Sequence, residues 1–264
     1  MVTSAGNNGR LVTDIDLQLD RRTGDVVRET ATADNVVVER TVAPDPRQTD
    51  LIARYSEVVA PIASRVVGSA TADITRTVDD TGETPLGNLI ADAQLADTRD
   101  EGAVAAFMNP GGVRADLPAG EVTYGEAFAV QPFANNLVTM DLTGAQLDCV
   151  LEQQYAGRTA PVVLQPSSTL RYTVSTSAPA GTLADPCSGQ KVSGLTIDGA
   201  PVDPATTYRI TVNNFLAGGG DGFGQLTGGT NALTSSIDLD AFTAYLGANR
   251  PVTAPATDRI TAIA

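Results

Sequence analysis

Alternation of apolar and polar residues marks the first part of the chain as β-structure. Within residues 9–20, apolar side chains such as Leu11 and Ile15 recur on one side of the chain. A period of two predicts a strand with one solvent-facing side. A turn at 21–25 and apolar pairs within 26–38 predict further strands. Because so short a meander has too little core to stand alone, these strands either open the following domain or close a preceding one.

Helical spacing follows between residues 50 and 67, where apolar side chains recur at every third or fourth position. Thr49 or Asp50 can cap the start of this helix, and Pro61 predicts a kink or a break within it. A second helix is predicted to begin after the N-cap Thr84, with proline at its first position. Two more helices are predicted, one after Thr143 and one over 238–246.

Short apolar runs between these helices predict strands. They are expected at 72–77, 104–108, 122–123, 137–142, 170–174, 192–202, 208–212 and 259–261. The run at 192–202 contains an Asp-Gly pair, which is typical of a tight β-hairpin. Strands and helices therefore alternate along most of the chain.

Composition and charge narrow the classes of function. The chain has 264 residues, of which 42% are hydrophobic, enough for a substantial core. Its net charge of −14 argues against nucleic acid or an anionic membrane as a partner, because both attract basic surfaces. No apolar run approaches the roughly 18 residues of a transmembrane helix, and the first residues do not have the pattern of a signal peptide.

The absence of histidine excludes histidine-dependent triads and histidine-containing zinc sites for this chain on its own. An enzyme that uses carboxylates alone, such as Asp221 and Glu126, is disfavoured because no paired acidic motif accompanies them. Cys149 and Cys187 are compatible with one disulfide or with buried free thiols, and two cysteines alone do not decide between these.

A glycine-rich segment after the strand at 208–212 concentrates the candidate chemistry. Four glycines surround Asp221, with Phe215 and Phe223 near the ends of the segment. Glycine lets backbone approach a ligand closely, a carboxylate there can accept hydrogen bonds from a polyol, and an aromatic face can carry a flat ring. A plain turn is the alternative. The order Asn-Phe-Leu-Ala-x-Gly-Gly-Asp-Gly-Phe resembles the nucleoside-binding loop of the 5'-nucleotidase family.

Three further motifs follow the order of that family: Gly-Asn-Leu-Ile at 87–90, Asn-Pro-Gly-Gly-Val-Arg at 109–114 and Pro-Phe-Ala-Asn at 132–135. The resemblance implies an α+β fold, a mixed β-sheet flanked by helices with the site on loops at the strand ends. Some members have phosphate-facing arginines where this sequence has Thr84 and Asn88, so the phosphate side of the site departs from the family pattern.

The resemblance also implies a domain order. Residues 71–264 resemble the C-terminal substrate-binding domain, 43–70 the linker helix, and 1–42 the last strands of an N-terminal metallophosphatase domain. In this interpretation the chain begins just past the catalytic domain of a secreted 5'-nucleotidase and is inactive alone. A free-standing nucleoside-binding module without enzymatic activity is the alternative hypothesis.

The implied site grips base and ribose. Phe133 and Phe215 are expected to stack on the base, Asp221 to accept from the ribose hydroxyls, and Arg114 to reach toward ribose and phosphate. The full set of implied substrate-binding residues is Asn109, Arg114, Phe133, Asn135, Phe215 and Asp221. No catalytic residue, metal or cofactor is implied within this chain, and a divalent metal pair is expected in the metallophosphatase domain.

The family resemblance extends to partners and location. The expected partners are a nucleoside or nucleotide and the metallophosphatase domain in cis, with neither nucleic acid nor membrane. Family members work outside the cytoplasm, so an extracellular, cell-surface or periplasmic location is implied. Since disulfides persist there, the resemblance implies a bond between Cys149 and Cys187.

Overall fold

The computed structural model describes residues 2–39 and 41–264, so two of the residues predicted to belong to the N-terminal strands, Met1 and Arg40, lie outside the described part. The chain divides into two compact units, Met1–Val58 and Val59–Ala264. Each unit is described by itself.

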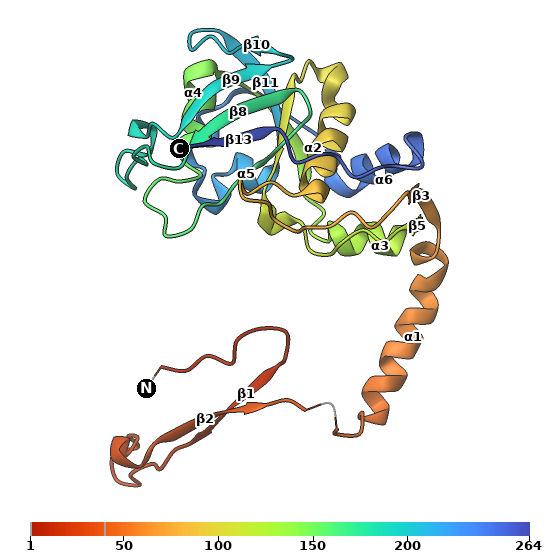
Figure 1. Ribbon diagram of the computed structural model, residues 1–264. Coiled ribbons are helices and arrows are strands. Elements are labelled where there is room, and N and C mark those ends of the chain that lie inside the picture. The colour runs from red at the N-terminus through yellow and green to blue at the C-terminus, as the bar shows by residue number, and fades with distance from the viewer. Residues whose placement is uncertain (1, 40) are drawn as a thin grey trace. The chain divides into compact units, whose positions relative to one another are not determined.

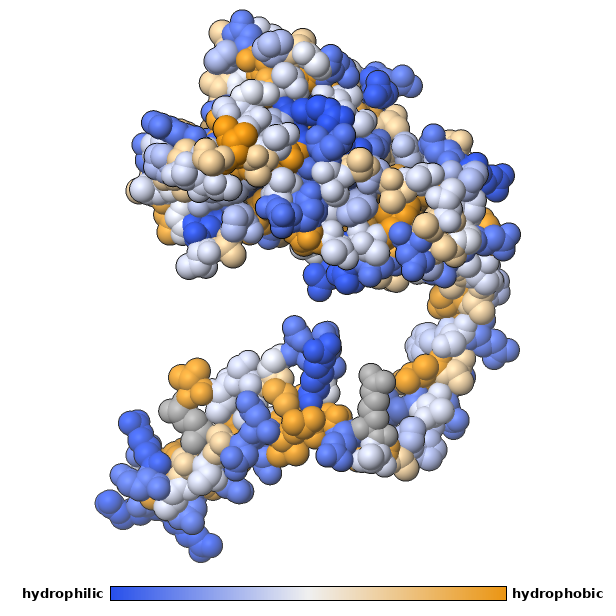
Figure 2. Space-filling view, in the orientation of Figure 1, coloured by the Kyte–Doolittle hydropathy of each residue, from blue (hydrophilic) through white to orange (hydrophobic). Residues whose placement is uncertain are grey.

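The first unit is a β-hairpin followed by most of a helix. Strand β1 (Leu11–Asp16) pairs antiparallel with β2 (Thr32–Val37), with a 3-10 turn η1 (Arg28–Thr30) before β2. Beyond Asp16 the predicted strand is reduced to an isolated bridge between Leu19 and Val26. No residue of β1, η1 or β2 is buried, and Figure 2 shows apolar side chains on the surface of this unit.

Helix α1 (Pro46–Ala63) spans the boundary between the units. It begins earlier than the spacing predicts and continues past Pro61, because the missing N–H of a proline so near the end removes a single bond from the last turn. None of its residues is buried. Its large apolar side chains are therefore exposed to solvent: Leu51, Ile52, Tyr55, Val58, Val59 and Ile62.

The main sheet of the second unit has five strands in the order β12-β6-β11-β4-β7. Their bounds are β4 (Ala105–Met108), β6 (Asn136–Thr143), β7 (Gln165–Pro166), β11 (Thr207–Asn213) and β12 (Thr230–Ile237). Strand β11 runs parallel to β4, with Ile210 opposite Ala105, and antiparallel to β6. The sheet is therefore mixed, which confirms the predicted fold class.

Two smaller sheets complete the unit (Figure 1). One has the order β10-β9-β8-β13, built from β8 (Leu170–Ser175), β9 (Val192–Ile197), β10 (Ala200–Pro201) and β13 (Ile260–Ile263). The other pairs β3 (Val66–Ala70) with β5 (Gly120–Thr123). The predicted strand at 72–77 is wrong, because only Ile74 there makes a bridge, to Leu117, and the pairing with β5 falls on the residues before it.

Two helices of the second unit, α2 and α4, begin at the threonine caps that the sequence predicts. The α-helices of this unit are α2 (Pro85–Thr98), α3 (Tyr124–Val130), α4 (Gly144–Glu152), α5 (Asn214–Ala217) and α6 (Asp238–Ala248). The hydroxyl of Thr84 accepts from the Gly87 N–H at 3.0 Å, and Thr143 forms a capping box with Gln146. Short 3-10 turns are η2 (Arg99–Glu101), η3 (Pro110–Gly112), η4 (Pro186–Ser188), η5 (Gly220–Gly222) and η6 (Gly224–Gly228).

The core consists of two large apolar clusters and a small third one. One large cluster joins the main sheet to α4 and to the β8–β9 pair and contains Phe223, which is fully buried. The other joins α2, α3 and α6 and contains Phe242. Cys149 of α4 is bonded to Cys187 of η4 across 38 positions of sequence, which confirms the expected disulfide and ties the loop before β9 to α4.

Candidate functional site

Three loops at the edge of the main sheet enclose a cavity of about 400 Å³. The loop after β4, the loop before β6 and the loop after β11 each contribute. Because β4 and β11 are parallel neighbours, the loops at their carboxyl ends meet at the same edge. The lining residues are Asn109, Gly111, Gly112, Phe133, Asn135, Phe215 and Asp221. Five of the six predicted substrate-binding residues are therefore brought together.

Asn109 stands at the centre of a chain of side-chain hydrogen bonds. It follows β4 directly and is buried. Its Nδ2 donates to Oδ2 of Asp221 at 2.9 Å, and its Oδ1 accepts from Nδ2 of Asn213 at 3.0 Å. Asn213 in turn caps α5, since its Oδ1 accepts from the Leu216 N–H at 2.9 Å. Both ends of the Asn109 amide are thereby fixed.

Asp221 has an unusual backbone conformation for a residue that is not glycine. Its φ of 53° lies in the left-handed region, between Gly219 at 84° and Gly222 at 83°. This conformation turns the carboxylate toward Asn109 on the neighbouring loop. Among the described residues, no hydrogen bond is made to the second carboxylate oxygen, Oδ1, which leaves an acceptor at the cavity.

The two predicted aromatic residues expose apolar surface at the cavity. Phe215 is 46% and Phe133 is 55% exposed, whereas Phe223 at the end of the glycine-rich segment is fully buried. A Cβ on Gly220 would lie 2.5 Å from the ring of Phe215, so the ring lies directly on the Gly220 backbone. A flat ligand in the cavity would cover exposed aromatic surface.

Arg114 lies beside the cavity without lining it. Its Nη1 donates to the Gly111 carbonyl at 3.1 Å, and its guanidinium carbon lies 5.8 Å from the ring centroid of Phe133. Arginine in that position stabilises the ring by a cation–π contact. Its predicted reach toward ribose and phosphate is a statement about a ligand and stays a prediction.

Asn135 is anchored to the start of α6. Its Nδ2 donates to Oδ2 of Asp238 at 3.3 Å, and its carbonyl accepts from the Asp238 N–H at 2.8 Å. Burial raises the pKa of Asp238, and the hydrogen bond from Asn135 partly offsets that effect. The loop that carries Phe133 is thus fixed at its end by a buried carboxylate.

The residues in place of the family's phosphate-facing arginines do not line the cavity. Thr84 and Asn88 are buried. Thr84 is the N-cap of α2, and Asn88 donates to Oε1 of Glu83 at 2.8 Å. Arg76 lines a separate hollow, where it pairs with Asp116 at 3.3 Å. These three residues therefore have structural partners of their own.

Two residues near the cavity had no predicted role. Asn213 opens the glycine-rich motif, and the structure shows that its side chain donates to Asn109. Arg158, in the turn after α4, donates from Nη2 to the backbone carbonyl of Asp221. It is 63 positions away from Asp221 in sequence and belongs to no recognisable motif, so no sequence pattern pointed to it.

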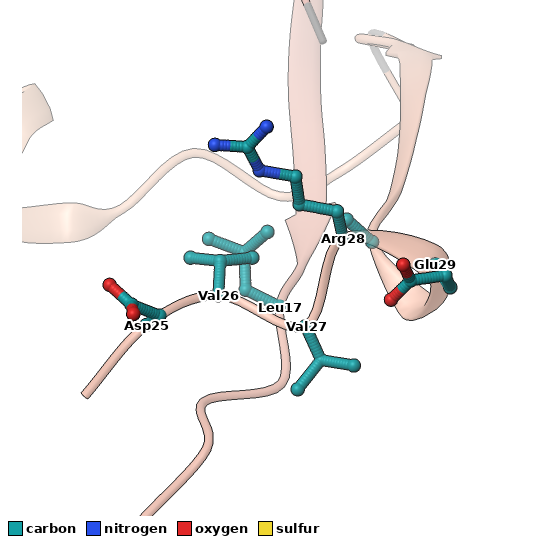
Figure 3. Close-up of a pocket in the computed structure, with 7 residues that line it drawn as sticks. Leu17, Asp25, Val26, Val27, Arg28 and Glu29 are labelled. Carbon is teal, nitrogen blue, oxygen red and sulfur yellow. The ribbon is translucent and has the colours of Figure 1, made fainter. Parts of the chain in front are cut away.

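A larger hollow of about 870 Å³ lies in the first unit, far in sequence from these residues (Figure 3). Figure 3 shows the side chains of Leu17 and Val26 together, whereas the charged groups of Asp25, Arg28 and Glu29 point in different directions. Because no polar groups converge there, the smaller cavity is the better candidate for a specific ligand.

Two findings bear on metals and membranes. Among residues 2–39 and 41–264, no group of three or more aspartate, glutamate, cysteine or histidine side chains is placed to hold a metal ion. The described residues thus do not form the donor set for a metal pair. None of the described helices combines the length and apolar character needed to cross a membrane.

The chain is similar to known proteins over most of its length. The profile of the family "5'-nucleotidase, C-terminal domain" matches residues 66–228. The endonuclease YhcR of Bacillus subtilis is 31% identical over 249 residues, covering 93% of this chain and 19% of that protein. The cell wall protein Lmo0130 of Listeria monocytogenes is 31% identical over 262 residues, covering 93% and 32%. The chain thus spans less than two fifths of the length of these relatives.

A solved structure supports the same assignment. The 5'-nucleotidase precursor from Thermus thermophilus superimposes with a TM-score of 0.73 at 31% sequence identity, over 97% of this chain and 50% of that one. The residues that the family profile matches include those that line the cavity. The chain is therefore a member of the 5'-nucleotidase C-terminal domain family.

Proposed function

We propose that the cavity binds the base and ribose of a nucleoside or nucleotide. The observation that carries the proposal is that Asn109, Phe133, Asn135, Phe215 and Asp221 line one cavity although they come from three separate loops. Two exposed phenylalanine rings suit a flat heterocycle, and the carboxylate of Asp221 suits a pair of neighbouring hydroxyls.

The energies expected of such a site are moderate. Stacking of a base on an aromatic side chain contributes roughly 1–3 kcal/mol. A hydrogen bond to a carboxylate contributes about 1.5–3 kcal/mol. Association also costs translational and rotational freedom, so binding by this chain alone is expected in the micromolar to millimolar range, roughly −8 to −4 kcal/mol.

In a wider context, this chain acts as the substrate-recognition part of a secreted 5'-nucleotidase-type phosphohydrolase. Metal-dependent hydrolysis is assigned to a metallophosphatase domain in cis, consistent with relatives that are several times longer than this chain. A location outside the cytoplasm is supported by the similarity to a cell wall protein and by the disulfide between Cys149 and Cys187.

Within this proposal the domain order is 1–42, 43–70 and 71–264: residual metallophosphatase strands, linker helix and substrate-binding domain. The support comes from exposure. No residue of β1, β2 or α1 is buried, and large apolar side chains on all three elements are exposed to solvent. Strands that complete a sheet of another domain would have this pattern.

Calorimetric titration of the full chain with adenosine tests the binding proposal. Phe215→Ala and Asp221→Ala are each expected to weaken binding about tenfold or more. Phe215→Ala should change the melting temperature little because its ring is half exposed, whereas Asp221→Ala also leaves the Asn109 amide without its acceptor. Phe242→Ala is the control. That ring is fully buried in the other core cluster, so its loss lowers stability and leaves the affinity of folded protein unchanged.

The opposite pattern would contradict the proposal. If Phe215→Ala unfolds the protein while the folded fraction keeps its affinity for adenosine, Phe215 belongs to the core. If the wild-type chain binds no nucleoside at millimolar concentration, the cavity has another ligand.

A further inference from the structure

We infer that Arg158 is a positioning residue for nucleoside binding, because it fixes the backbone of Asp221 and so the direction of the carboxylate. The inference rests on the proposed function, since it concerns the affinity of the same cavity. Arg158 is not among the residues that line the cavity. Any effect on the ligand is therefore transmitted through Asp221.

Three contacts hold the guanidinium of Arg158 in place. Its Nη2 donates to the backbone carbonyl of Asp221, and its Nε donates to the carbonyl of Gln153 at 2.9 Å. Its Cζ lies 5.5 Å from the ring centroid of the buried Phe223. A planar group with several donors can satisfy all three at once, so it joins the end of α4 rigidly to the glycine-rich loop.

Gln153, whose carbonyl accepts from Arg158, is itself bonded to the glycine-rich loop. The side chain of Gln153 accepts from the Gln225 N–H at 3.1 Å, so Gln153 contacts the loop directly as well as through Arg158. Gln153 is the C-cap of α4, the helix that carries the disulfide-bonded Cys149. The position of Arg158 is therefore set by a well-anchored element.

The loop needs an external contact of this kind. Asp221 adopts φ 53° and ψ 17°, a conformation that residues other than glycine keep only when their surroundings impose it. Its neighbours Gly219 and Gly222 are the residue type with the greatest backbone freedom. A Cβ on Gly222 would lie 2.8 Å from Nη2 of Arg158, so the guanidinium packs directly on that glycine.

The arginine contacts the carbonyl and leaves the carboxylate available. Oδ2 of Asp221 is bonded to Asn109, and within the described part of the chain no ion pair joins Arg158 to this carboxylate. A salt bridge would have competed with ligand hydroxyls for the same oxygens. Arg158 instead orders the loop without neutralising the group that recognises the ligand.

The test compares two ligands on the full chain by calorimetry: adenosine, and 2',3'-dideoxyadenosine, which lacks the neighbouring 2'- and 3'-hydroxyls. Arg158→Gln is expected to weaken adenosine binding about tenfold, the loss typical of one hydrogen bond to a charged group. Binding of the dideoxy compound should be almost unchanged, because stacking on the phenylalanines does not depend on Asp221.

Arg171→Gln is the matched control. Arg171 also donates to a backbone carbonyl, that of Asp258, and it is on β8 and is not among the residues that line the cavity. Arg171→Gln should leave the affinities for adenosine and for the dideoxy compound unchanged. Arg158→Lys keeps the charge but not the fork of donors, and is expected to fall between wild type and Arg158→Gln, which provides a milder variant if the glutamine variant folds poorly. In the Asp221→Ala background, Arg158→Gln should cause no further loss of adenosine affinity.

The outcomes separate this inference from the proposed function. If wild type binds adenosine and Asp221→Ala weakens that binding, but neither Arg158 variant changes the ratio of the two affinities, the inference is overturned and the proposed function stands. Equal loss for both ligands also overturns it, since that is general damage to the cavity. If wild type does not bind adenosine, both fail together.

Discussion

The side-chain amide of Asn109 donates to the carboxylate of Asp221 over 2.9 Å, joining two residues that are 112 positions apart in sequence. The bond links the loop after β4 to the loop after β11. It holds one carboxylate oxygen in place, while the other accepts no hydrogen bond from the described residues, so the cavity is organised before any ligand enters it. Such pre-organisation lowers the entropy cost of binding.

Gly220→Ala is predicted to weaken nucleoside binding with little loss of stability. The added Cβ would lie 2.5 Å from the Phe215 ring and must displace it, and the ring is half exposed and free to move outward. We expect about a tenfold loss in adenosine affinity, measured by calorimetry. Gly228→Ala in the same loop is the control, because the nearest atom to its Cβ would be at an ordinary 3.7 Å. Unchanged affinity in Gly220→Ala would show that Phe215 does not contact the base.

The full chain is predicted not to hydrolyse adenosine monophosphate, with or without added manganese or zinc. It has no histidine, and the described carboxylates form no cluster suited to a metal pair. Release of inorganic phosphate is the measurement. Turnover that survives purification and is abolished by Asp221→Ala would contradict the assignment of catalysis to another domain.

Deletion of residues 1–42 is predicted to leave the second unit folded with nearly the same melting temperature. Strands β1 and β2 pair with one another and bury no residue. Deletion of 259–264 is the contrasting variant. It removes β13 and the ion pair of Arg259 with Asp92, at 2.7 Å and largely buried, and should lower the melting temperature strongly. Loss of the cooperative transition in the first deletion would place those strands in the core.

Replacement of both Cys149 and Cys187 by alanine is predicted to lower the free energy of unfolding by about 3–4 kcal/mol, the loop-entropy value for a bond that closes 38 positions. Urea unfolding measures this difference. Under reducing conditions the wild type should approach the variant. Thiol titration of the unfolded, unreduced wild type should detect no free thiol, and two titrating thiols would refute the bond.

Glu152→Gln is predicted to stabilise the protein increasingly as the pH rises. Burial raises the pKa of Glu152 above its ordinary value of 4.5. Its Oε1 accepts from the Val192 N–H, while its Oε2 has no partner among the described residues. Stability contributed by such a group is complete below the ordinary pKa and is lost as the pH rises through the raised pKa. Glutamine cannot ionise and avoids that loss.

Urea unfolding of wild type and Glu152→Gln between about pH 4 and pH 7 measures the effect. The two should be similar at the acidic end, and the variant should be the more stable at neutral pH. Glu121→Gln, at an exposed position of β5, controls for the change in net charge. A difference that is the same at every pH would contradict the role of burial.

Much of the fold and the site could be predicted because the signals are local. Threonine caps and apolar periodicity predict α2, α4 and most strands, and the short motifs predict the loops that meet at the cavity. Three strands differ from the prediction: β7 and β12 are not predicted, and β3 lies before the strand predicted at 72–77. Strand β12 is mostly polar and exposed, so only its pairing with β6 identifies it, and the apolar start of β3 continues the helical spacing before it.

The remaining site residues could not be predicted because their partners are distant in sequence. Arg158 sits in a turn whose composition resembles that of any loop, and its acceptor on Asp221 is defined only by the folded backbone. Asn213 makes two hydrogen bonds through its side chain. It accepts locally from the Leu216 N–H and donates across to Asn109. The local task follows from capping rules, whereas the second requires the parallel pairing of β4 and β11.

The row of side-chain hydrogen bonds from Asn213 through Asn109 to the carboxylate of Asp221 limits how this cavity can diversify. The middle residue must accept from one neighbour and donate to the next, so aspartate, which only accepts when ionised, and leucine, which does neither, would each leave a partner unsatisfied. Changing ligand preference by mutation at Asn109 would also disturb the cap of α5. New specificity is more readily introduced at Phe133 or Phe215, whose exposed rings can be exchanged without breaking that row.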